Sequence, residues 1–427
     1  MLIQLIYRSR SLHSFAPPEL ARLGETLTAR NQGLRVRGLL LYDGAYFLQV
    51  LEGEDAVVDA LYQHVCGDSR HTDIVLLLRD PIARSHFADF QMKTLDVRQA
   101  PGPCARDDAA CWATELGVNW HRDHRCVRII EAFVRGRWRD AVPAAAWAGD
   151  AVEPAPRPAA PVRASVPRVW QTSARFALQP IVHSRARRIT SVEALLRGPQ
   201  GEPAQQVLAS VAPADLHAFD LRSKADAIAL VAALRLECSL SVNLLPMSLV
   251  ANDRAVDFLI DACQRHQWPL DRLQVEITEE EAITHVDAFL GAVQKLRASG
   301  IQVAIDDFGA GHAGLSLLAD FQPDKLKLDK RIVQGVCSSG PRQAIVRSVI
   351  EFCFCLGITV VAEGVETEDD WRWLQAAGVR RFQGYLFARP SLQGVAPVVW
   401  PVPNAGGSTQ GYASDGEPGG RRLTVMQ

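Results

Sequence analysis

The stretch Gln302-Val-Ala-Ile-Asp-Asp307 joins a short apolar run to two adjacent carboxylates. Between residues 172 and 391, similar strand-like runs alternate with helix-like runs at the cadence of a parallel β/α barrel. Barrel enzymes place their active sites at the carboxyl ends of the strands, so polar residues at those ends predict a site. Eight successive strands carry such residues: Gln179, Glu193, Asn243, Glu276, Asp306 followed by Asp307, Lys327, Glu363 and Gln383.

The carboxylates at this rim predict divalent metal ions. Five carboxylates and one amide converging on one rim would repel one another unless cations lay between them. Oxygen ligands without histidine or cysteine favour Mg²⁺ or Mn²⁺, and this number suits two ions that share an aspartate. Such a pair activates water for attack on a phosphodiester. A lysine would assist, but Lys325 and Lys327 lie on the same face of one strand, so spacing does not choose between them.

The first hundred residues predict a second, smaller domain. We expect strands at 2–7, 36–42, 46–51, 74–78 and 90–95 and helices at 18–30 and 54–65, with a tight turn at Asp43-Gly44. This order indicates a ferredoxin-like α/β sandwich over residues 1–97. Helical residues 98–142 are expected to cap it, residues 143–171 form an Ala/Pro-rich linker, and residues 392–427 form a disordered tail.

Composition limits the class of protein. The formal net charge of −2 gives no basic field for DNA or RNA, so a nucleotide ligand must be held by a local site. Nine cysteines, an odd number without zinc spacing, suggest a reducing cytoplasm. The apolar run at the N-terminus is too short for a signal peptide, and no segment reaches the length of a membrane span. We therefore expect a cytoplasmic protein.

Five ordered motifs in the barrel region resemble those of EAL-domain cyclic di-GMP phosphodiesterases: Glu193-Ala-Leu195, Val275-Glu-Ile-Thr-Glu279, Ala304-Ile-Asp-Asp-Phe-Gly309, Ala362-Glu-Gly-Val-Glu366 and Gln383-Gly-Tyr-Leu-Phe387. The resemblance implies hydrolysis to the linear dinucleotide pGpG by a homodimer. It implies that Lys327 acts on the attacking water, together with the catalytic residues Glu193, Asp306 and Glu363. The implied metal ligands are Glu193, Asn243, Glu276, Asp306, Asp307 and Glu363. The implied substrate contacts are Gln179, Arg197 and Gln383, with Glu279 and Glu366 supporting the site.

One loop departs from the EAL pattern. After Asp307 the chain reads Phe308-Gly-Ala-Gly-His-Ala-Gly314, where the family commonly has an aromatic residue and two serines towards the end. In the family this loop links metal binding to the dimer interface. The departure at His312, Ala313 and Gly314 therefore bears on that coupling more than on the chemistry.

The first domain resembles the BLUF family of flavin photoreceptors. The matching segments are Leu5-Ile-Tyr-Arg-Ser9, Ala29-Arg-Asn31, Gly38-Leu-Leu-Leu-Tyr42, Phe47-Leu-Gln-Val-Leu-Glu-Gly53 and Asp68-Ser-Arg-His71. The resemblance implies a non-covalent flavin, FAD or FMN, held by Arg30 and Asn31. It also implies a hydrogen-bond switch between Tyr7 and Gln49, with Met92 in signal output. Phe90 stands where tryptophan is frequent, and Arg37 where threonine is common.

Together these features predict a phosphodiesterase regulated by blue light, with the lit state expected to be the active one. One alternative is a light-responsive adaptor whose barrel binds cyclic di-GMP or a partner protein without turnover. Another is a phosphodiesterase that is always active, with an empty first domain. The complete carboxylate set favours the enzyme over the adaptor.

Overall fold

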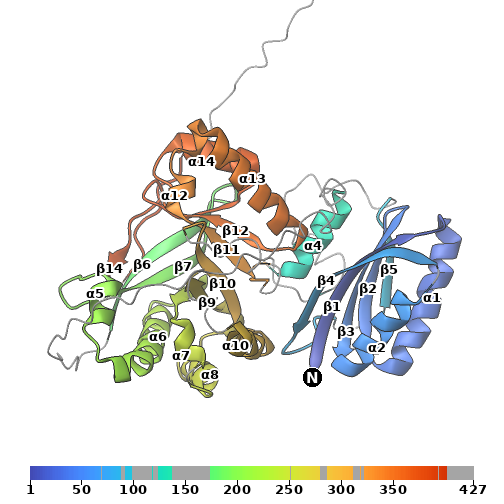
Figure 1. Cartoon of the computed structure of the whole chain (residues 1–427), viewed down its shortest axis with the longest axis horizontal. Coiled ribbons are helices and arrows are strands. Elements are labelled where there is room, and N and C mark those ends of the chain that lie inside the picture. Colours follow the sequence, from blue (N-terminus) through green and yellow to red (C-terminus); the bar gives the residue numbers. More distant parts are fainter. Residues whose placement is uncertain are drawn as a thin grey trace, which may run out of the picture.

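The computed structural model describes residues 1–68, 70–87, 92–98, 118, 124–136, 174–250, 252–278, 286–310, 318, 322–392 and 394–401. These residues form a small α/β domain and a larger barrel domain that lie side by side (Figure 1). The predicted linker lies outside the described residues, as do most of the predicted capping helices. One helix of that region is described, α4 (Arg125–Val134).

The N-terminal domain is built on a five-stranded sheet of order β4-β1-β3-β2-β5, which is the order of a ferredoxin-like fold with one added edge strand. Strand β5 lies parallel to β2, whereas β1 is antiparallel to both β3 and β4. The β2–β3 turn is the predicted one, because Gly44 has a φ of +102° and Asp43 accepts hydrogen bonds from the next backbone amides. The strands are β1 (Leu2–Ser11), β2 (Arg37–Tyr42), β3 (Tyr46–Glu54), β4 (His71–Pro81) and β5 (Met92–Asp96).

Helices cover both faces of this sheet. Tyr7, Leu51 and Leu61 belong to an apolar cluster on the face covered by α2 (Asp55–Cys66), and α1 (Pro17–Leu34) covers the same face beside it. The alternate residues of the strands, such as Ile6 and Val50, pack against α4 on the other face. The sheet therefore separates Tyr7 from α4.

The larger domain is a closed barrel of eight strands, and the predicted α/β fold class is confirmed. Pairing between β13 and β6 closes the barrel. One detail differs from an all-parallel barrel: β6 is antiparallel to both of its neighbours. Gln179 therefore reaches the rim from the middle of β6, where it pairs with Glu193. The strands are β6 (Arg175–His183), β7 (Arg188–Arg197), β8 (Ser239–Asn243), β9 (Leu273–Thr278), β10 (Gln302–Phe308), β11 (Lys325–Leu328), β12 (Thr359–Ala362) and β13 (Arg381–Phe382).

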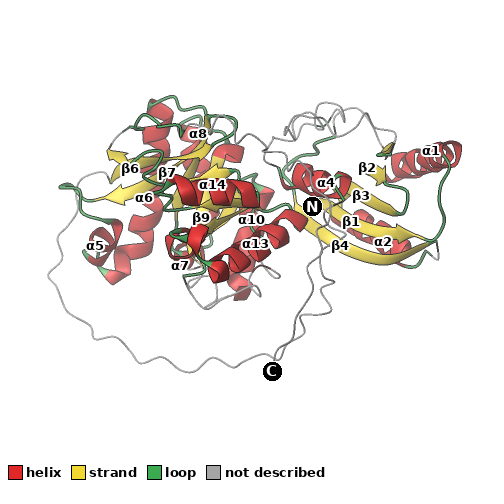
Figure 2. Ribbon diagram, turned by 90° about the horizontal axis from the view of Figure 1, so that it is seen from above, coloured by secondary structure: helices red, strands yellow, loops and turns green. Residues whose placement is uncertain are grey.

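Helices surround the barrel and bury the outward residues of its strands (Figure 2). The chain stays ordered beyond the predicted start of the tail at residue 392. A short strand β14 (Ser391–Leu392) pairs with β6, and Trp400 packs against the core with the guanidinium of Arg187 5.7 Å from its ring centre. The helices are α5 (Ala204–Ala209), α6 (Leu216–Ala233), α7 (Pro246–Val250), α8 (Ala255–Arg265), α10 (Val286–Ala298), α12 (Lys330–Val333), α13 (Gly340–Cys355) and α14 (Glu368–Ala377).

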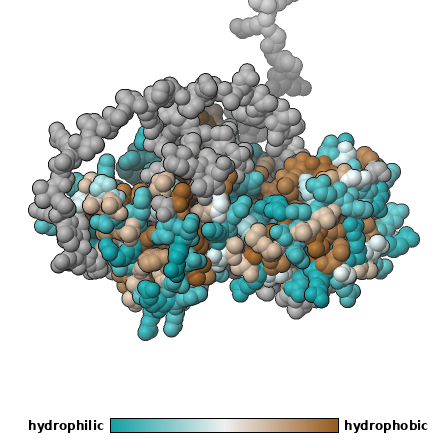
Figure 3. Space-filling model, turned by 60° about the horizontal axis from the view of Figure 1, so that its bottom comes forward, coloured by the Kyte–Doolittle hydropathy of each residue, from teal (hydrophilic) through white to brown (hydrophobic). Residues whose placement is uncertain are grey.

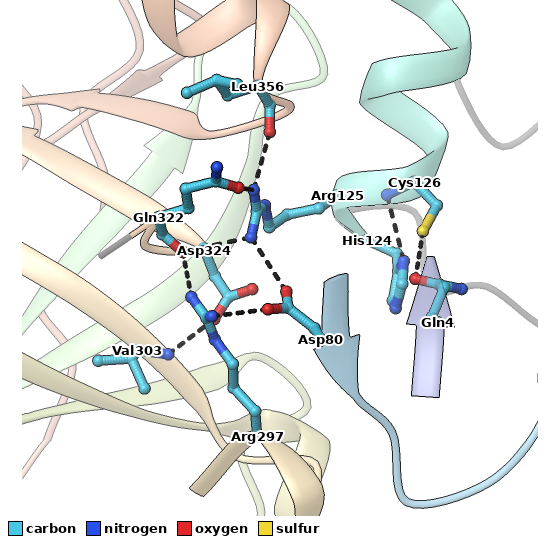
Figure 4. A network of polar contacts seen from close by, with 10 residues as sticks. All are labelled: Gln4, Asp80, His124, Arg125, Cys126, Arg297, Val303, Gln322, Asp324 and Leu356. Atoms are coloured by element: carbon cyan, nitrogen blue, oxygen red, sulfur yellow. Dashed lines mark hydrogen bonds and ion pairs between the residues drawn. The ribbon is translucent and has the colours of Figure 1, made fainter. Parts of the chain in front are cut away.

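Helix α4 lies between the two domains (Figure 1). Its first residue, Arg125, is 4% exposed and joins them through its guanidinium group (Figure 4). This group bonds to Asp80 of β4 at 3.1 Å, to the side chain of Gln322 at 2.7 Å and to the carbonyl of Leu356 at 3.2 Å. Arg297 of α10 binds the other oxygen of Asp80 at 2.9 Å. A network of paired charges therefore ties the N-terminal domain to the barrel.

This contact lies at the floor of the barrel, where the strands begin. Gln322 lies three residues before the start of β11, and Leu356 and Gly357 lie two or three residues before the start of β12. Gly357 has a φ of +68°, and a Cβ atom there would lie 2.6 Å from the carbonyl oxygen of Arg125. Glycine adopts this conformation at the lowest cost, and the close approach leaves no room for a Cβ atom. The N-terminal domain thus docks on the face opposite the rim that carries the predicted site.

The surface carries both polar and apolar side chains. Apolar side chains gather on part of the N-terminal domain in the view of Figure 3, and the exposed large apolar residues of that domain include Val75 and Leu76 on β4. Among the described helices, none combines the length and apolar character needed to cross a membrane.

Candidate active site

Four buried polar side chains meet inside the barrel just below its rim. Glu193, Glu276, Lys327 and Gln383 come from the alternate strands β7, β9 and β11 and from the end of β13, and they are between 0% and 5% exposed. The ammonium nitrogen of Lys327 lies 2.7 Å from Glu276 and 3.2 Å from Glu193. The amide of Gln383 donates to Glu193 at 2.7 Å. Strands far apart in sequence therefore bring the predicted residues into one cluster.

The remaining strand ends extend this cluster to the rim. Carboxylates of Glu363 and Asp306 lie 2.7 Å and 3.2 Å from Lys327 Nζ, so this ammonium contacts four acidic residues. Asn243 donates to Glu193 at 2.7 Å. Adjacent residues of a strand normally point to opposite faces, but the left-handed φ of 54° at Asp307 interrupts this alternation at an irregularity within β10. Both Asp306 and Asp307 therefore reach the rim.

The carboxylates form two groups with metal-binding spacing, and Asp306 belongs to both. One group is Glu193, Glu276 and Asp306, and the other is Asp306, Asp307 and Glu363; within each group, one oxygen per residue lies within 4.8 Å of the others. Oε1 of Glu276 is buried and has no hydrogen-bond partner among the described residues. All donors are hard oxygens, which suit Mg²⁺ or Mn²⁺. The residues present therefore fit two such ions that share Asp306.

The electrostatics of the site also indicate missing positive charge. Burial raises the pKa of Glu276 to about 8 although the Lys327 ammonium opposes this, and burial also raises the pKa of Glu363. Partial burial and the Asp306 carboxylate raise the pKa of Asp307 to about 6. The four carboxylates outweigh the effect of burial on Lys327 and raise its pKa well above the usual value. One ammonium group does not neutralise five acidic residues, so the site favours added cations.

A cavity of about 310 Å³ opens above these residues. Its walls include Glu366, for which the resemblance implies a supporting role, and three residues without a role predicted from the sequence: Asp329, Lys330 and Tyr385. Asp329 follows directly after β11, so its place at a strand end was the available signal. The predicted residues lining the cavity are Gln179, Glu193, Asp306, Asp307, Glu363 and Gln383.

The structure separates two lysines that spacing left equivalent. Both Lys325 and Lys327 point into the barrel and are buried, but Lys325 bonds to the side chain of Gln274. Lys327 contacts the carboxylate cluster. Arg197 donates to the carbonyl of Leu196 at 2.9 Å and is not among the residues lining the cavity. Glu279 and the loop segment 312–314 lie outside the described residues.

The N-terminal domain holds a second group of buried polar side chains. The hydroxyl of Tyr7 donates to Oε1 of Gln49 on the adjacent strand, and both residues are at most 6% exposed. Asn31, in the last turn of α1, donates to the sulfur of Met92 at 3.4 Å. Arg30 precedes it and is exposed. Burial raises the pKa of Tyr7, so the phenol is held protonated as a hydrogen-bond donor.

These residues fit the polar edge of a flavin. Tyr7, Gln49 and Asn31 lie on the sheet face covered by α1 and α2, and the two apolar clusters on that face are separate. Amide side chains offer both donors and acceptors, as the flavin ring requires, and Tyr7 and Gln49 already bond to each other. Four of the five predicted cofactor residues therefore lie on one face of the sheet as two bonded pairs, Tyr7 with Gln49 and Asn31 with Met92, and Arg30 is exposed but near enough for its charge to act on the Tyr7 phenol.

Fold and sites define a two-domain protein, in which a ferredoxin-like domain with a buried tyrosine–glutamine pair is docked on a barrel with a carboxylate-rich mouth. Residues 169–390 match the sequence model of the EAL domain, and residues 2–93 match that of the sensors of blue-light using FAD, the BLUF domain. The chain belongs to the EAL-domain family and carries a BLUF domain in front of the barrel.

Full-length relatives share this architecture. The blue light- and temperature-regulated antirepressor BluF of Escherichia coli is 35% identical over 413 residues, which cover 94% of this chain and 99% of BluF. BlrP1 of Klebsiella pneumoniae, solved in a manganese/cyclic di-GMP complex, is 38% identical, with a TM-score of 0.53 over 94% of this chain and all of BlrP1. A standalone EAL protein of Vibrio cholerae with bound cyclic di-GMP is 36% identical, with a TM-score of 0.51, and covers 54% of this chain and 97% of its own.

Proposed function

We propose that this protein hydrolyses cyclic di-GMP to linear pGpG under the control of blue light absorbed by a flavin in the BLUF domain. The observation that carries the hydrolase is the pair of carboxylate groups that share Asp306 around Lys327. Mg²⁺ or Mn²⁺ bound there would supply an activated water and stabilise charge on the phosphodiester. BlrP1 and the Vibrio cholerae protein were both solved with cyclic di-GMP, which supports this substrate.

The chain's own residues have distinct roles in this proposal. Gln383 and Asn243 fix the Glu193 carboxylate through hydrogen bonds of 2.7 Å. Lys327 holds four carboxylates and is placed to orient the attacking water and to stabilise charge on the phosphoryl oxygens. Gln179 lines the cavity beside Gln383 and is placed to contact the nucleotide.

The light signal has a physical route from the flavin to the barrel. On the α4 face of the sheet, Gln4 of β1 bonds to Glu52 of β3 at 2.6 Å and accepts from the thiol of Cys126 at 2.5 Å. Gln4 and Glu52 lie three residues from Tyr7 and Gln49 on the same two strands. A change in the Tyr7–Gln49 bond that moves these strands would therefore reach the first turn of α4, where Arg125 contacts the barrel.

The name of one relative supports a second function. BluF is called an antirepressor, and it matches this chain over 413 residues. In that alternative, the barrel binds cyclic di-GMP or a partner protein in a light-dependent way without turnover. The intact carboxylate cluster does not by itself separate hydrolysis from binding, because the same residues can bind a ligand without hydrolysing it. A turnover assay separates the two functions.

Turnover of cyclic di-GMP by the flavin-loaded protein, in darkness and under blue light, with Mg²⁺ or Mn²⁺, tests the proposal. We expect faster release of pGpG in the light. Equal nonzero rates would keep the hydrolase and exclude the light coupling. No turnover with either metal in either state, combined with tight binding of cyclic di-GMP, would favour the adaptor.

A further inference from the structure

The cluster of Glu193, Glu276, Lys327 and Gln383 is called the catalytic cluster here. The barrel interior is polar within this cluster and also in the layer below it, towards the start of the strands. Side chains two residues apart on a strand point to the same face, so the positions two before Glu193, Glu276, Lys327 and Gln383 also face the interior. Barrels of this class commonly fill such a layer with valine, isoleucine and leucine. Here the layer is polar and between 0% and 4% exposed, and its members are Ser191, Gln274, Lys325 and Arg381.

The neighbouring strands add two more hydroxyl groups. Ser241 lies two residues before Asn243, and its Cα pairs with Glu193 on one side and Gln274 on the other. Thr359 pairs with Lys325 at the start of β12. Ser241 is 0% exposed and Thr359 is 2% exposed. The interior below the catalytic cluster is thus surrounded by small hydroxyl side chains.

Among the uncharged side chains of this region, four polar atoms lack a hydrogen-bond partner among the described residues: Oγ of Ser191, Oγ of Ser241, Nε2 of Gln274 and Oγ1 of Thr359. Leaving a buried donor or acceptor unpaired costs about 1–3 kcal/mol, and most such groups in folded proteins are paired with protein or with ordered water. Four of them around one interior region therefore require a shared explanation.

We propose that ordered water occupies the barrel directly below the catalytic residues, bound to the hydroxyls of Ser191, Ser241 and Thr359 and to the amide of Gln274. Two features of the region suit water. Serine at two positions and alanine at a third, Ala304, are smaller than the branched apolar residues usual in such a layer, and the hydroxyl and amide groups offer the two to four polar partners that each water needs. Gln274 is already oriented, because its Oε1 accepts from Lys325 and its Nε2 is left as the donor.

Hydration here has a consequence for the site above. Lys325 and Lys327 lie two residues apart, and both are buried. Buried charges are costly over an apolar floor and less so where polar groups solvate them. The proposed water is therefore a structural ligand that lowers the cost of placing two lysines and a carboxylate cluster inside one barrel.

The sign of a stability change tests this proposal in the full-length protein. Thr359→Val removes one hydroxyl and keeps the side-chain shape. If water binds that hydroxyl, Thr359→Val lowers Tm by roughly 2–4 °C, because the bound water loses a partner. Thr190→Val is the matched control, since Thr190 is also buried and donates to the carbonyl of Ile181 at 3.1 Å. The proposal is overturned if Thr359→Val leaves Tm unchanged or raises it while Thr190→Val lowers it.

A crystal structure of the unmodified protein provides the second test, which does not depend on how the variants fold. We expect density for water at hydrogen-bonding distance, about 2.7–3.2 Å, from Oγ of Ser241 and Nε2 of Gln274. A dry interior in which the hydroxyls of Ser191 and Ser241 donate to backbone carbonyls would overturn the proposal.

Discussion

Replacing Lys327 with methionine separates its role from that of its neighbour on the strand. Methionine keeps an unbranched apolar chain and removes the ammonium group, which lies 2.7–3.2 Å from four carboxylate oxygens. Removing one preorganised group that stabilises developing charge typically costs about 10²–10³ in kcat, or roughly 2.7–4 kcal/mol. We therefore expect Lys327→Met to lower kcat for cyclic di-GMP by about two to three orders of magnitude.

Lys325→Met is the matched control for this experiment. Lys325 is on the same strand, faces the same interior and is similarly buried, but it contacts Gln274 instead of the carboxylates. Turnover per folded molecule should stay within about threefold of the parent protein. The assay is steady-state release of pGpG at saturating Mn²⁺, with the folded fraction measured by thermal unfolding. Equal losses in both variants, or a loss below tenfold in Lys327→Met, would refute the assignment.

Three further predictions concern the regulation and the metal site. Arg125→Ala should bring the ratio of lit to dark turnover close to one and leave the light-induced flavin spectrum intact, because it removes the contacts to Asp80 and to the barrel floor; a persisting light effect would exclude this route. Tyr7→Phe should retain flavin but abolish its light-induced absorbance change, because the hydrogen bond to Gln49 is lost; an unchanged spectral response would contradict the switch. The affinity for Mn²⁺ should rise with pH up to about 8 and then level off. Below that pH the Glu276 carboxyl, with its raised pKa, holds a proton that the metal must displace. Calorimetric titrations that show no dependence of the affinity on pH between 6 and 8 would contradict this.

Most of the fold followed from local patterns in the sequence. The Asp43-Gly44 turn and the alternation of apolar residues predicted the N-terminal sheet, although β4 extends over eleven residues where five were expected. The direction of β6 did not follow, because β6 is buried on both faces and such a strand is a nearly continuous apolar run whichever direction it takes.

The residues of the candidate site that lie at strand ends could be predicted, because the ends of the barrel strands converge. Glu193, Asp306 and Lys327 followed from position, but Lys325 and Lys327 were equivalent until the register of the barrel placed one against carboxylates and the other against Gln274. Asp329 lies one residue past β11 and two residues after Lys327, so the period of two would have placed it on the same face as Lys327, but only the residues inside the strand were considered. The contacts of Arg125 join residues about two hundred positions apart, so no local pattern reveals them.

The docking of the BLUF domain on the floor of the barrel limits the ways in which the proposed light signal would act on turnover. The described residues of the BLUF domain lie where the strands begin, away from the cavity above Asp306 and Glu363, so they do not cover that cavity as a lid does. Its influence has to pass along the strands, of which β11 has only four residues between floor and rim. Regulation along the strands would change the positions of the catalytic side chains. It does not require that the entrance of the cavity be blocked. The same floor would serve any input domain that offers a helix with an arginine at its first turn, so the barrel can acquire a new stimulus without a change to its chemistry.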